Sequence, residues 1–282
     1  MKIRKIILLL ALGLLLLWSR SYLSDLFWLV IALEACIVTY IIFSVIKGVI
    51  SLKNRTGIDF SNNIRIVLEQ KLGKSFLVEF VITEFNVFYY SLLVWIEKSR
   101  TVDHNGKAFT YHRTSEMKTF IIVFAILITG EGVLFHYLLQ KWNEVIAWVF
   151  TILNVYGILY LVGFYNSTKH LPHMISGEKI IIRLGFQSSI SLDIENIEQL
   201  NRAKEIELGM KIPKSTYYSL LKLDSPHFEI VLKEPVEMRG SYGMKKMVDK
   251  VVFRADDQDA ILEEINLVKT LDFKSHANQR SL

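Results

Sequence analysis

Residues 119–165 read TFIIVFAILITGEGVLFHYLLQKWNEVIAWVFTILNVYGILYLVGFY, two long apolar runs separated by the short polar connection Gln140–Glu144. A bilayer core is about 30 Å thick and needs about 20 apolar residues in one helix, a length that both runs reach. Trp142 and Trp148 lie near the connection, and tryptophans gather at membrane–water interfaces. The stretch therefore predicts two membrane-spanning helices in an antiparallel hairpin, over about 119–139 and 145–165.

Two further apolar runs precede this hairpin in the sequence. The second of them, about 26–46, is long enough to cross a membrane as one helix. The first, Ile6–Trp18, is shorter and follows three bases, which is also the pattern of a signal peptide. Because Ser19–Tyr22 holds no small-residue cleavage pattern, we expect an uncleaved anchor, and therefore four spans in total.

Basic residues predict the orientation of these spans. The flanks before the first and third spans and after the second and fourth carry Lys2, Arg4, Lys5, Lys47, Lys53, Arg55, Arg113, Lys118 and Lys169. The opposite flanks carry Arg20 and Lys141. Because short cytoplasmic loops are enriched in lysine and arginine, we expect a multi-pass plasma-membrane protein with both termini in the cytoplasm.

The segment Phe76–Ile96 competes with this count, because it is long and apolar enough for a fifth span. It carries three polar side chains that are costly in hydrocarbon: Glu79, Glu84 and Asn86. A fifth span would also move the basic stretch Lys98–Lys107 and everything after it outside. We therefore expect a long amphipathic helix over about Ser61–Trp95, on the inner membrane surface or against the bundle, with Glu79 and Glu84 facing water.

From about Ser176 the pattern changes to short runs typical of strands, separated by turn residues. The expected strands are Lys179–Leu184, Ser188–Leu192, Tyr217–Leu223, Phe228–Leu232, Val236–Arg239 and Met247–Phe253. A final helix then begins with Asp256 or Asp257 as its cap, with apolar residues at helical spacing through Val268. Several antiparallel strands and one helix predict a sandwich or partly open barrel.

The expected fold class is thus an α-helical membrane bundle, with four spans and a long amphipathic helix, followed by a small β-rich domain with a C-terminal helix. The expected boundaries are 1–175 for the transmembrane part, 176–271 for the cytoplasmic β domain and 272–282 for a disordered tail.

The β-rich part resembles bacterial pleckstrin-homology-like (PH-like) domains. The resemblance is carried by the strand–turn–strand Gly177–Leu192, the step Asp193–Ile197 and the closing junction Arg254–Ile261. The whole chain is similar to an uncharacterised family of bacterial multispanning membrane proteins, through Tyr89, Tyr90, Trp95, Glu131, His136, Leu138, Leu139, Trp142, Ala147 and Trp148. The resemblance implies a membrane protein with a PH-like domain and implies no established activity.

Two groups of bases could meet lipid in such a domain. Lipid-binding relatives use bases between the first two strands, where this chain has Lys179 and Arg183 but no base in the turn Gly185–Ser188. A second group consists of Arg239, Lys245, Lys246 and Lys250. This group is either a surface for anionic lipid or a partner, or simply a solvated strand face.

Ionisable groups inside a membrane are functional candidates, because each is costly in hydrocarbon. The expected spans carry an intramembrane polar cluster of Glu34, Glu131, His136 and Asn154. Interhelical hydrogen bonding, a proton- or ion-linked translocation site and a metal or redox site all remain open. Against the metal site, Glu131 and His136 are five residues apart and so point about 140° away from one another on a helix.

The sequence favours a non-enzymatic protein. It has one cysteine, Cys36, so it forms no intrachain disulfide, and it lacks a nucleophile elbow and a zinc motif. We expect no cofactor and no nucleic acid, but the lipid bilayer and another membrane or cytosolic protein as partners. The preferred hypothesis is a membrane-anchored scaffold or binding module, and the alternative is a small ion- or proton-linked transporter or membrane enzyme using Glu34, Glu131 and His136.

Overall fold

The computed structural model describes residues 65, 68–70, 73, 75–95, 106–204, 213–221 and 224–279. The expected spans at 6–18 and 26–46, with Glu34, lie outside these residues. Contacts divide the chain into two compact units, Met1–Ile82 and Thr83–Leu282. Within the first unit, Arg65 forms an ion pair with Glu79.

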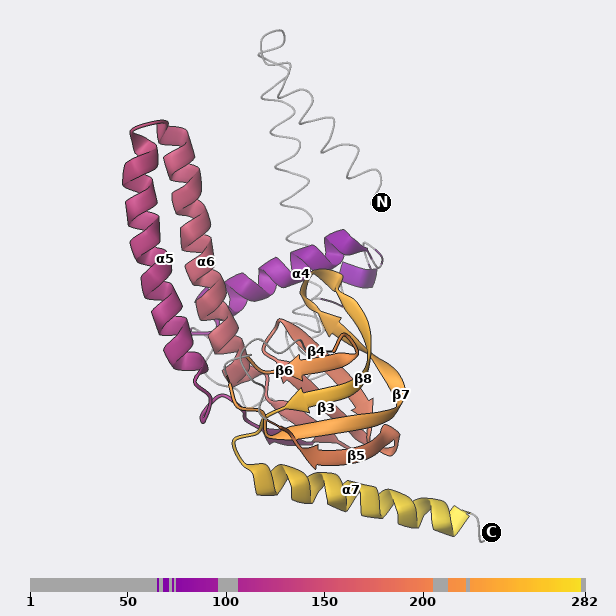
Figure 1. Ribbon diagram of the computed structural model, residues 1–282. Coiled ribbons are helices and arrows are strands. Elements are labelled where there is room, and N and C mark those ends of the chain that lie inside the picture. Colours follow the sequence, from indigo (N-terminus) through magenta and orange to yellow (C-terminus); the bar gives the residue numbers. More distant parts are fainter. Residues whose placement is uncertain are drawn as a thin grey trace. The chain divides into compact units, whose positions relative to one another are not determined.

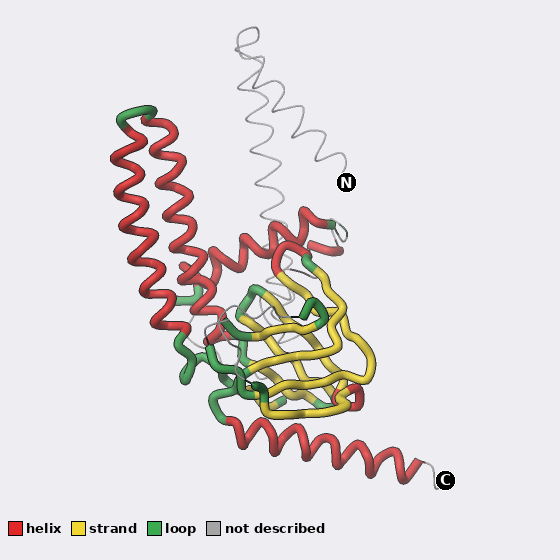
Figure 2. The backbone as a smooth tube through the Cα atoms, in the orientation of Figure 1, coloured by secondary structure: helices red, strands yellow, loops and turns green. Residues whose placement is uncertain are grey.

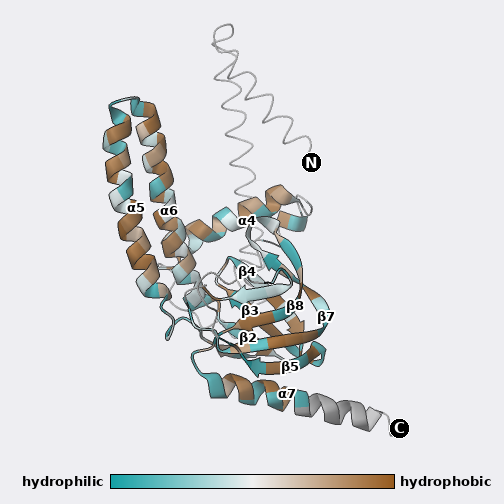
Figure 3. Ribbon diagram, viewed as in Figure 1, coloured by the Kyte–Doolittle hydropathy of each residue, from teal (hydrophilic) through white to brown (hydrophobic). Residues whose placement is uncertain are grey.

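Of the described residues, three helical segments are long and apolar enough to cross a membrane. They are α4 (Phe76–Phe88) with its π-helical continuation η1 (Tyr89–Leu93), α5 (Met117–Gln140) and α6 (Glu144–His170). The last two confirm the helices predicted over 119–139 and 145–165. Their ribbons are mostly hydrophobic in Figure 3.

A tight turn joins α5 and α6 into an antiparallel hairpin (Figure 1). The side chain of Asn143 caps α6 by accepting a hydrogen bond from the backbone N–H of Ile146 at 3.1 Å. Such a cap supplies a partner for a free N–H at the helix start. Large apolar side chains from Ile122 to Leu138 on α5 and from Val145 to Val155 on α6 are exposed, as expected for a surface in contact with lipid.

The described strands form one eight-stranded mixed sheet (Figure 2). They are β1 (Lys107–Phe109), β2 (His173–Ser176), β3 (Lys179–Leu184), β4 (Ser188–Asp193), β5 (Ile197–Arg202), β6 (Thr216–Ser219), β7 (Phe228–Gly240) and β8 (Lys245–Phe253). Their order is β1-β2-β3-β4-β7-β8-β6, and β5 pairs with β7. The expectation of several antiparallel strands is confirmed, and β6, which runs parallel to β8, makes the sheet a mixed one.

Strand β7 covers two of the expected strands, Phe228–Leu232 and Val236–Arg239. Its register with β8 shifts between Val231 and Val236, and Pro235 lies inside this irregularity. Proline has no N–H for a ladder hydrogen bond and is tolerated at a bulge. The part of β7 before the bulge pairs with β5, and its last two residues pair with β4.

The α5–α6 hairpin is inserted between two neighbouring strands of the sheet. Strand β1 precedes α5, β2 follows α6, and the two pair antiparallel with Phe109 opposite His173. Both strands begin before residue 176, where the β domain was expected to start, although the domain boundaries as such stay a prediction. Both ends of the hairpin are thus fixed to the sheet by a short connection.

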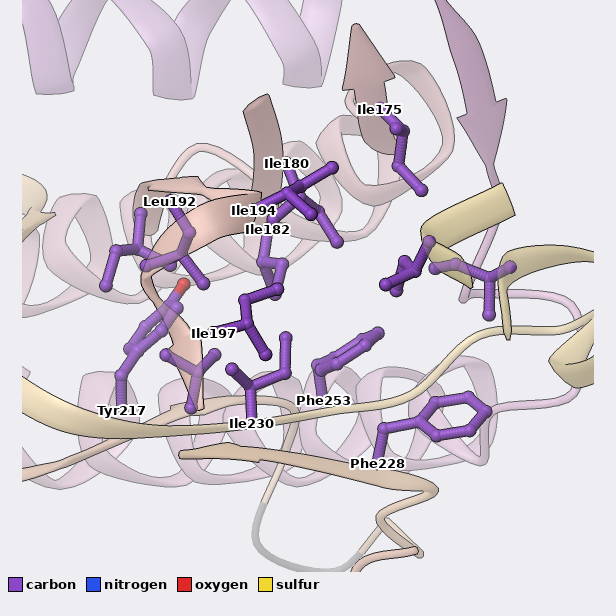
Figure 4. Close-up of a cluster of buried hydrophobic side chains, with 14 of the residues drawn as sticks. Ile175, Ile180, Ile182, Leu192, Ile194, Ile197, Tyr217, Phe228, Ile230 and Phe253 are labelled. Atoms are coloured by element: carbon purple, nitrogen blue, oxygen red, sulfur yellow. The ribbon is translucent and has the colours of Figure 1, made fainter. Parts of the chain in front are cut away.

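One hydrophobic core joins the sheet to the last helix, α7 (Gln258–Gln279). Alternate residues of β3, among them Ile180 and Ile182, point into this core with Ile194, Ile230 and Phe253 (Figure 4). Ile261 and Ile265 of α7 are fully buried in the same cluster.

The start of α7 confirms one of the two expected caps. The carboxylate of Asp257 accepts a hydrogen bond from the backbone N–H of Ala260 at 3.0 Å. The helix runs past Asp272, after which a disordered tail was expected, and the disorder of that tail stays a prediction.

Candidate functional site

The expected intramembrane cluster is partly described. Asn154 lies on α6 against Gly132 of α5, where an added β-carbon would be 3.2 Å from the Asn154 Cγ atom. The Asn154 amide donates to the backbone carbonyl of Phe150 at 2.8 Å. Glu131 lies beside Gly132 in the sequence, is exposed, and forms no hydrogen bond or ion pair with any residue that the structure describes. Glu131 and Asn154 therefore share a level but not a hydrogen bond.

His136 lies one to two turns nearer the α5–α6 connection. Its Nδ1 atom is 2.7 Å from the hydroxyl of Thr151, and its ring meets Trp148 edge-on. The Thr151 hydroxyl donates to the carbonyl of Ala147 at 2.9 Å, so its oxygen accepts from the histidine. His136 is thus engaged between α5 and α6, and no group of three metal-binding side chains occurs among the described residues.

The basic group on β7 and β8 is largely engaged with carboxylates and backbone. Glu237 lies 2.9 Å from Lys245 and 3.8 Å from Arg239, measured between the charged atoms. Lys250 pairs with Glu229 at 3.1 Å. Lys246 donates to the backbone carbonyl of Thr216 at 3.0 Å.

A polar and aromatic cluster lies where α4, α6 and two turns of the sheet meet. We call it the helix–sheet junction and define it by Glu84, Tyr156, Tyr160, Phe186, Gln187 and Tyr242. Its centre is the carboxylate of Glu84, which accepts from the Tyr156 hydroxyl at 2.7 Å and from the Tyr242 hydroxyl at 3.0 Å. Glu84, which was expected on the water-facing side of the helix, is half-buried and binds these two tyrosines.

Tyr242 reaches the junction from the β7–β8 turn in an uncommon backbone conformation. Its φ of 58° lies in the left-handed region, where a side chain is disfavoured. Its backbone N–H donates to the Thr83 hydroxyl at 3.0 Å, in addition to the bond from its own hydroxyl to Glu84. Strained residues persist where their surroundings fix them from several sides, and this turn is fixed to α4 in that way.

The β3–β4 turn fills the other half of the junction. The ring of Phe186 lies among those of Tyr90, Tyr160 and Phe164, with centroid distances of 5.5–6.3 Å. The amide of Gln187 donates to the Tyr160 hydroxyl at 3.0 Å. Gly185 has a positive φ of 50°, and a β-carbon there would collide with the Ser167 hydroxyl. Glycine thus lets this turn approach α6.

Helix α6 approaches the end of α4 and η1 closely at Gly163. A β-carbon on Gly163 would lie 2.8 Å from the backbone carbonyl oxygen of Val87. Nearby, the Asn166 amide donates to the carbonyl of Tyr90 at 3.0 Å. Small residues at helix contacts allow such close approach in membranes.

A second polar cluster holds the segment before α5. Arg254, at the end of β8, forms a buried ion pair with Asp224 and donates to the carbonyl and hydroxyl oxygens of Thr114 at 2.8 and 2.9 Å. Asp256 accepts from the backbone N–H groups of Thr114 and Arg113 at 2.9 and 3.1 Å. Burial by itself raises the pKa of Asp256, but these hydrogen bonds outweigh it and lower the pKa.

A neutral histidine is built into the base of the hairpin. The ring of His173 stacks on that of Tyr111 at 4.3 Å between centroids, and its Nδ1 atom accepts from the N–H of Arg183 at 3.1 Å. Its Nε2–H therefore donates to the carbonyl of Arg254 at 2.9 Å. Complete burial lowers the pKa of His173 to about 3. Its role is structural, because both nitrogens are occupied by backbone groups.

Sequence reasoning missed the helix–sheet junction. Tyr156 and Tyr160 are four residues apart and share one face of α6, which was a signal in the sequence. Both tyrosines lie inside the apolar run at 145–165, which was interpreted as a membrane span from its hydrophobicity alone. Gln187 and Tyr242 had no local signal, because the turns that carry them reach α6 through tertiary packing.

The fold defines the class: a membrane-type helical hairpin inserted between two strands of a mixed sheet, with a C-terminal helix on its core. Comparison with protein-family models, with curated proteins and with solved structures gives no significant match for this chain.

Proposed function

We propose that the protein is an integral membrane protein that holds a β domain at the cytoplasmic membrane surface as a scaffold or binding module. The observation that carries the proposal is the insertion of α5–α6 between β1 and β2. A domain attached at both ends of a membrane hairpin keeps a fixed orientation toward the bilayer. Such an orientation suits a module that presents one surface to a partner.

The side chains of α5 and α6 support their place in the bilayer. Both helices expose large apolar side chains to the outside, and water would make that surface unfavourable. The bases of the flanks, Arg113 and Lys118 before α5 and Lys169 at the end of α6, support a cytoplasmic position for the β domain.

The amphipathic character of α4 and η1 supports a helix along the inner membrane surface rather than a further span. The polar side chains of Thr83, Asn86 and Ser91 are buried in the protein. On the outside, Phe88 and Leu92 are exposed. A helix that buries a mixed face, with Val78, Ile82 and Val87 beside these polar groups, and exposes an apolar face suits the boundary between protein and lipid.

For the β domain we propose a PH-like fold. The support is a sheet whose strand β7 pairs with three neighbours, and a C-terminal helix whose Ile261 and Ile265 are buried in the sheet core. The expected partner is a cytosolic or membrane protein that binds the exposed sheet surface.

Cysteine labelling of the full chain tests the topology. In a Cys36→Ser background, Trp142→Cys lies in the turn of the hairpin and Glu198→Cys on exposed β5. We expect a membrane-impermeant maleimide to label position 142 in intact cells, and position 198 after permeabilisation alone. Labelling of position 198 in intact cells would overturn the cytoplasmic placement.

Photo-crosslinking in cells tests the binding role. A photoreactive amino acid is placed at exposed positions of the sheet, such as Glu198 and Gln199, and at the lipid-facing Ile126 as a control. We expect neighbouring sheet positions to trap the same protein and Ile126 to trap none of it. If every exposed sheet position fails to trap a protein, the binding role is contradicted.

A further inference from the structure

The described part of the sheet exposes large apolar side chains at one place. Among the described residues of the sheet and its turns, these are Met244 and Met247, with exposed fractions of 69% and 57%. Both belong to the β7–β8 hairpin tip, which we define as Tyr242–Met247. Exposed apolar side chains that gather on a soluble domain mark a contact surface.

This tip is fixed to the membrane helices. Tyr242 bonds to Thr83 through its backbone and to Glu84 through its hydroxyl, and the same Glu84 accepts from Tyr156 of α6. Thr83 and Glu84 both belong to α4, so these bonds hold the β7–β8 turn to that helix. The tip is therefore within two hydrogen bonds of a helix that we place in the bilayer.

The level of that contact lies in the sheet-side half of the hairpin's apolar belt. A β-carbon on Gly157 would touch Ile128, and one on Gly132 would touch Asn154, so Tyr156 is level with about Thr129. The exposed apolar surface of α5 continues from there to Ile122, about 10 Å nearer the sheet at 1.5 Å per residue. Helix α4, which carries Glu84, meets α6 at Gly163 beside Val87, and in the same register Gly163 is level with about Ile122. The tip thus lies near the sheet-side edge of the apolar belt, where the acyl region meets the headgroups.

The charges around the two methionines complement a lipid surface. Between residues 237 and 247, Arg239, Lys245 and Lys246 oppose the single carboxylate Glu237, which leaves a net charge of +2. Arg239 and Lys245 keep more than half of their side chains exposed despite their pairing with Glu237. Bases with long stems extend toward headgroup phosphates while neighbouring apolar side chains enter the acyl region.

We propose that the β7–β8 hairpin tip is a second membrane anchor, with Met244 and Met247 in the acyl region of the inner leaflet and Arg239 and Lys245 at anionic headgroups. This inference rests on the proposed function, because it requires α5 and α6 to lie in the bilayer. It assigns a lipid ligand to part of the basic group and leaves the rest of the sheet surface for a protein partner.

Spin labelling of the full chain in vesicles tests the anchor. In a Cys36→Ser background, nitroxides are attached at Met244→Cys, at Glu198→Cys on β5 and at Ile126→Cys on α5. Collisions with oxygen report lipid, and collisions with a water-soluble nickel complex report water. We expect position 244 to behave like position 126, with oxygen accessibility several-fold above that of position 198.

The three labelled positions distinguish failure of the anchor from failure of the proposed function. If position 126 reports lipid and position 244 reports water, the anchor is wrong and the membrane hairpin stands. If position 126 itself reports water, the proposed function fails and the anchor fails with it.

The lipid charge gives an independent readout. We expect the oxygen accessibility at position 244 to rise when phosphatidylglycerol is mixed into phosphatidylcholine vesicles, and Lys245→Gln to remove most of that rise. The matched control is Lys179→Gln, because Lys179 is also an exposed, paired lysine on the sheet, 3.6 Å from Asp193. An equal loss in both variants, or no response to phosphatidylglycerol, would overturn the headgroup part of the proposal.

Discussion

Arg254 and Asp224 form an ion pair whose side chains are 5% and 3% exposed, at the base of the α5–α6 hairpin. Asp224 also accepts from the Ser115 hydroxyl, and Arg254 also donates to Thr114. The pair thus joins the loop before β7 and the end of β8 to the segment that leads into α5. It is the most buried of the ion pairs among the described residues.

Removing one partner of this ion pair should lower the stability of the folded protein strongly. Asp224→Ala leaves the Arg254 charge buried without its carboxylate, and we expect a loss of about 3–5 kcal/mol in the free energy of unfolding. Denaturant unfolding of the purified protein in detergent measures it. Asp193→Ala is the control, because Asp193 pairs with Lys179 at a solvent-exposed site. Its loss should lower the free energy of unfolding by less than about 1 kcal/mol. Equal costs for both variants would contradict the structural role.

Two glycines in the hairpin should respond to alanine with opposite sign. Gly130→Ala places its methyl group where no atom lies within 4 Å, so helix propensity should stabilise it by up to about 1 kcal/mol. Gly163→Ala places its methyl group 2.8 Å from the Val87 carbonyl oxygen, so we expect a loss of about 1–3 kcal/mol. Thermal unfolding of the two variants gives the comparison, and a gain at both positions would refute the close approach.

The buried His173 should make the protein acid-sensitive. Its pKa is about 3 in the folded chain, against an ordinary 6.5, because burial disfavours the charged ring. Between these values the unfolded chain binds a proton that the folded chain does not. The free energy of unfolding should therefore fall with decreasing pH below about 6.5, by up to about 1.4 kcal/mol per pH unit.

The variant His173→Gln isolates this contribution. Unfolding measured between pH 7 and pH 5 should decline less steeply in the variant than in the parent protein. A smaller slope should remain, because burial also lowers the pKa of His112 and of His227. Identical slopes in parent and variant would argue against a neutral His173.

Phe186 should hold the β3–β4 turn to the helices. Phe186→Ala removes a half-buried ring from contact with Tyr90, Tyr160 and Phe164, and we expect a loss of roughly 2 kcal/mol. Hydrogen exchange should become faster in η1 and in the turn, because their contact is weakened. Phe186→Leu keeps most of the volume and should lose under about 1.5 kcal/mol. Unchanged exchange in the alanine variant would place the attachment elsewhere.

Glu131 should separate an anchoring role from a transport role. A carboxyl in hydrocarbon costs about 2.5–3.5 kcal/mol on insertion scales, so Glu131→Leu should stabilise a purely structural hairpin. Glu131→Gln should keep assembly and any partner binding, measured by the crosslinks from the sheet. Full assembly together with loss of an ion or proton flux in vesicles would instead favour the transporter hypothesis.

Hydropathy and alternation predicted the regular parts of the fold. Strand β3 has the predicted bounds, Lys179–Leu184, because its alternating apolar residues Ile180, Ile182 and Leu184 are all buried. The sequence did not reveal β1, a strand of three residues in a basic loop that pairs with β2 across the whole hairpin. It also did not reveal β5, whose residues from Glu198 onward are mostly polar and exposed. Both strands exist because of long-range pairing rather than local preference.

The candidate site divides in the same way. Residues that are costly in a membrane, such as Glu131 and His136, could be predicted from the sequence, since their cost depends on type and depth alone. The sequence indicated that Glu84 is costly in a membrane, but it could not predict the partners of its carboxylate. These partners, Tyr156 and Tyr242, lie 72 and 158 residues away along the chain. Only the folded chain brings them together.

The pairing of β1 with β2 constrains the order in which the sheet can fold. The ribosome delivers β1 first, and residues 110–172 must follow before its neighbour in the sheet exists. Packing of α5 against α6 as an antiparallel hairpin brings the ends of that stretch together. The β1–β2 pair can therefore close only after both helices of the hairpin have been made.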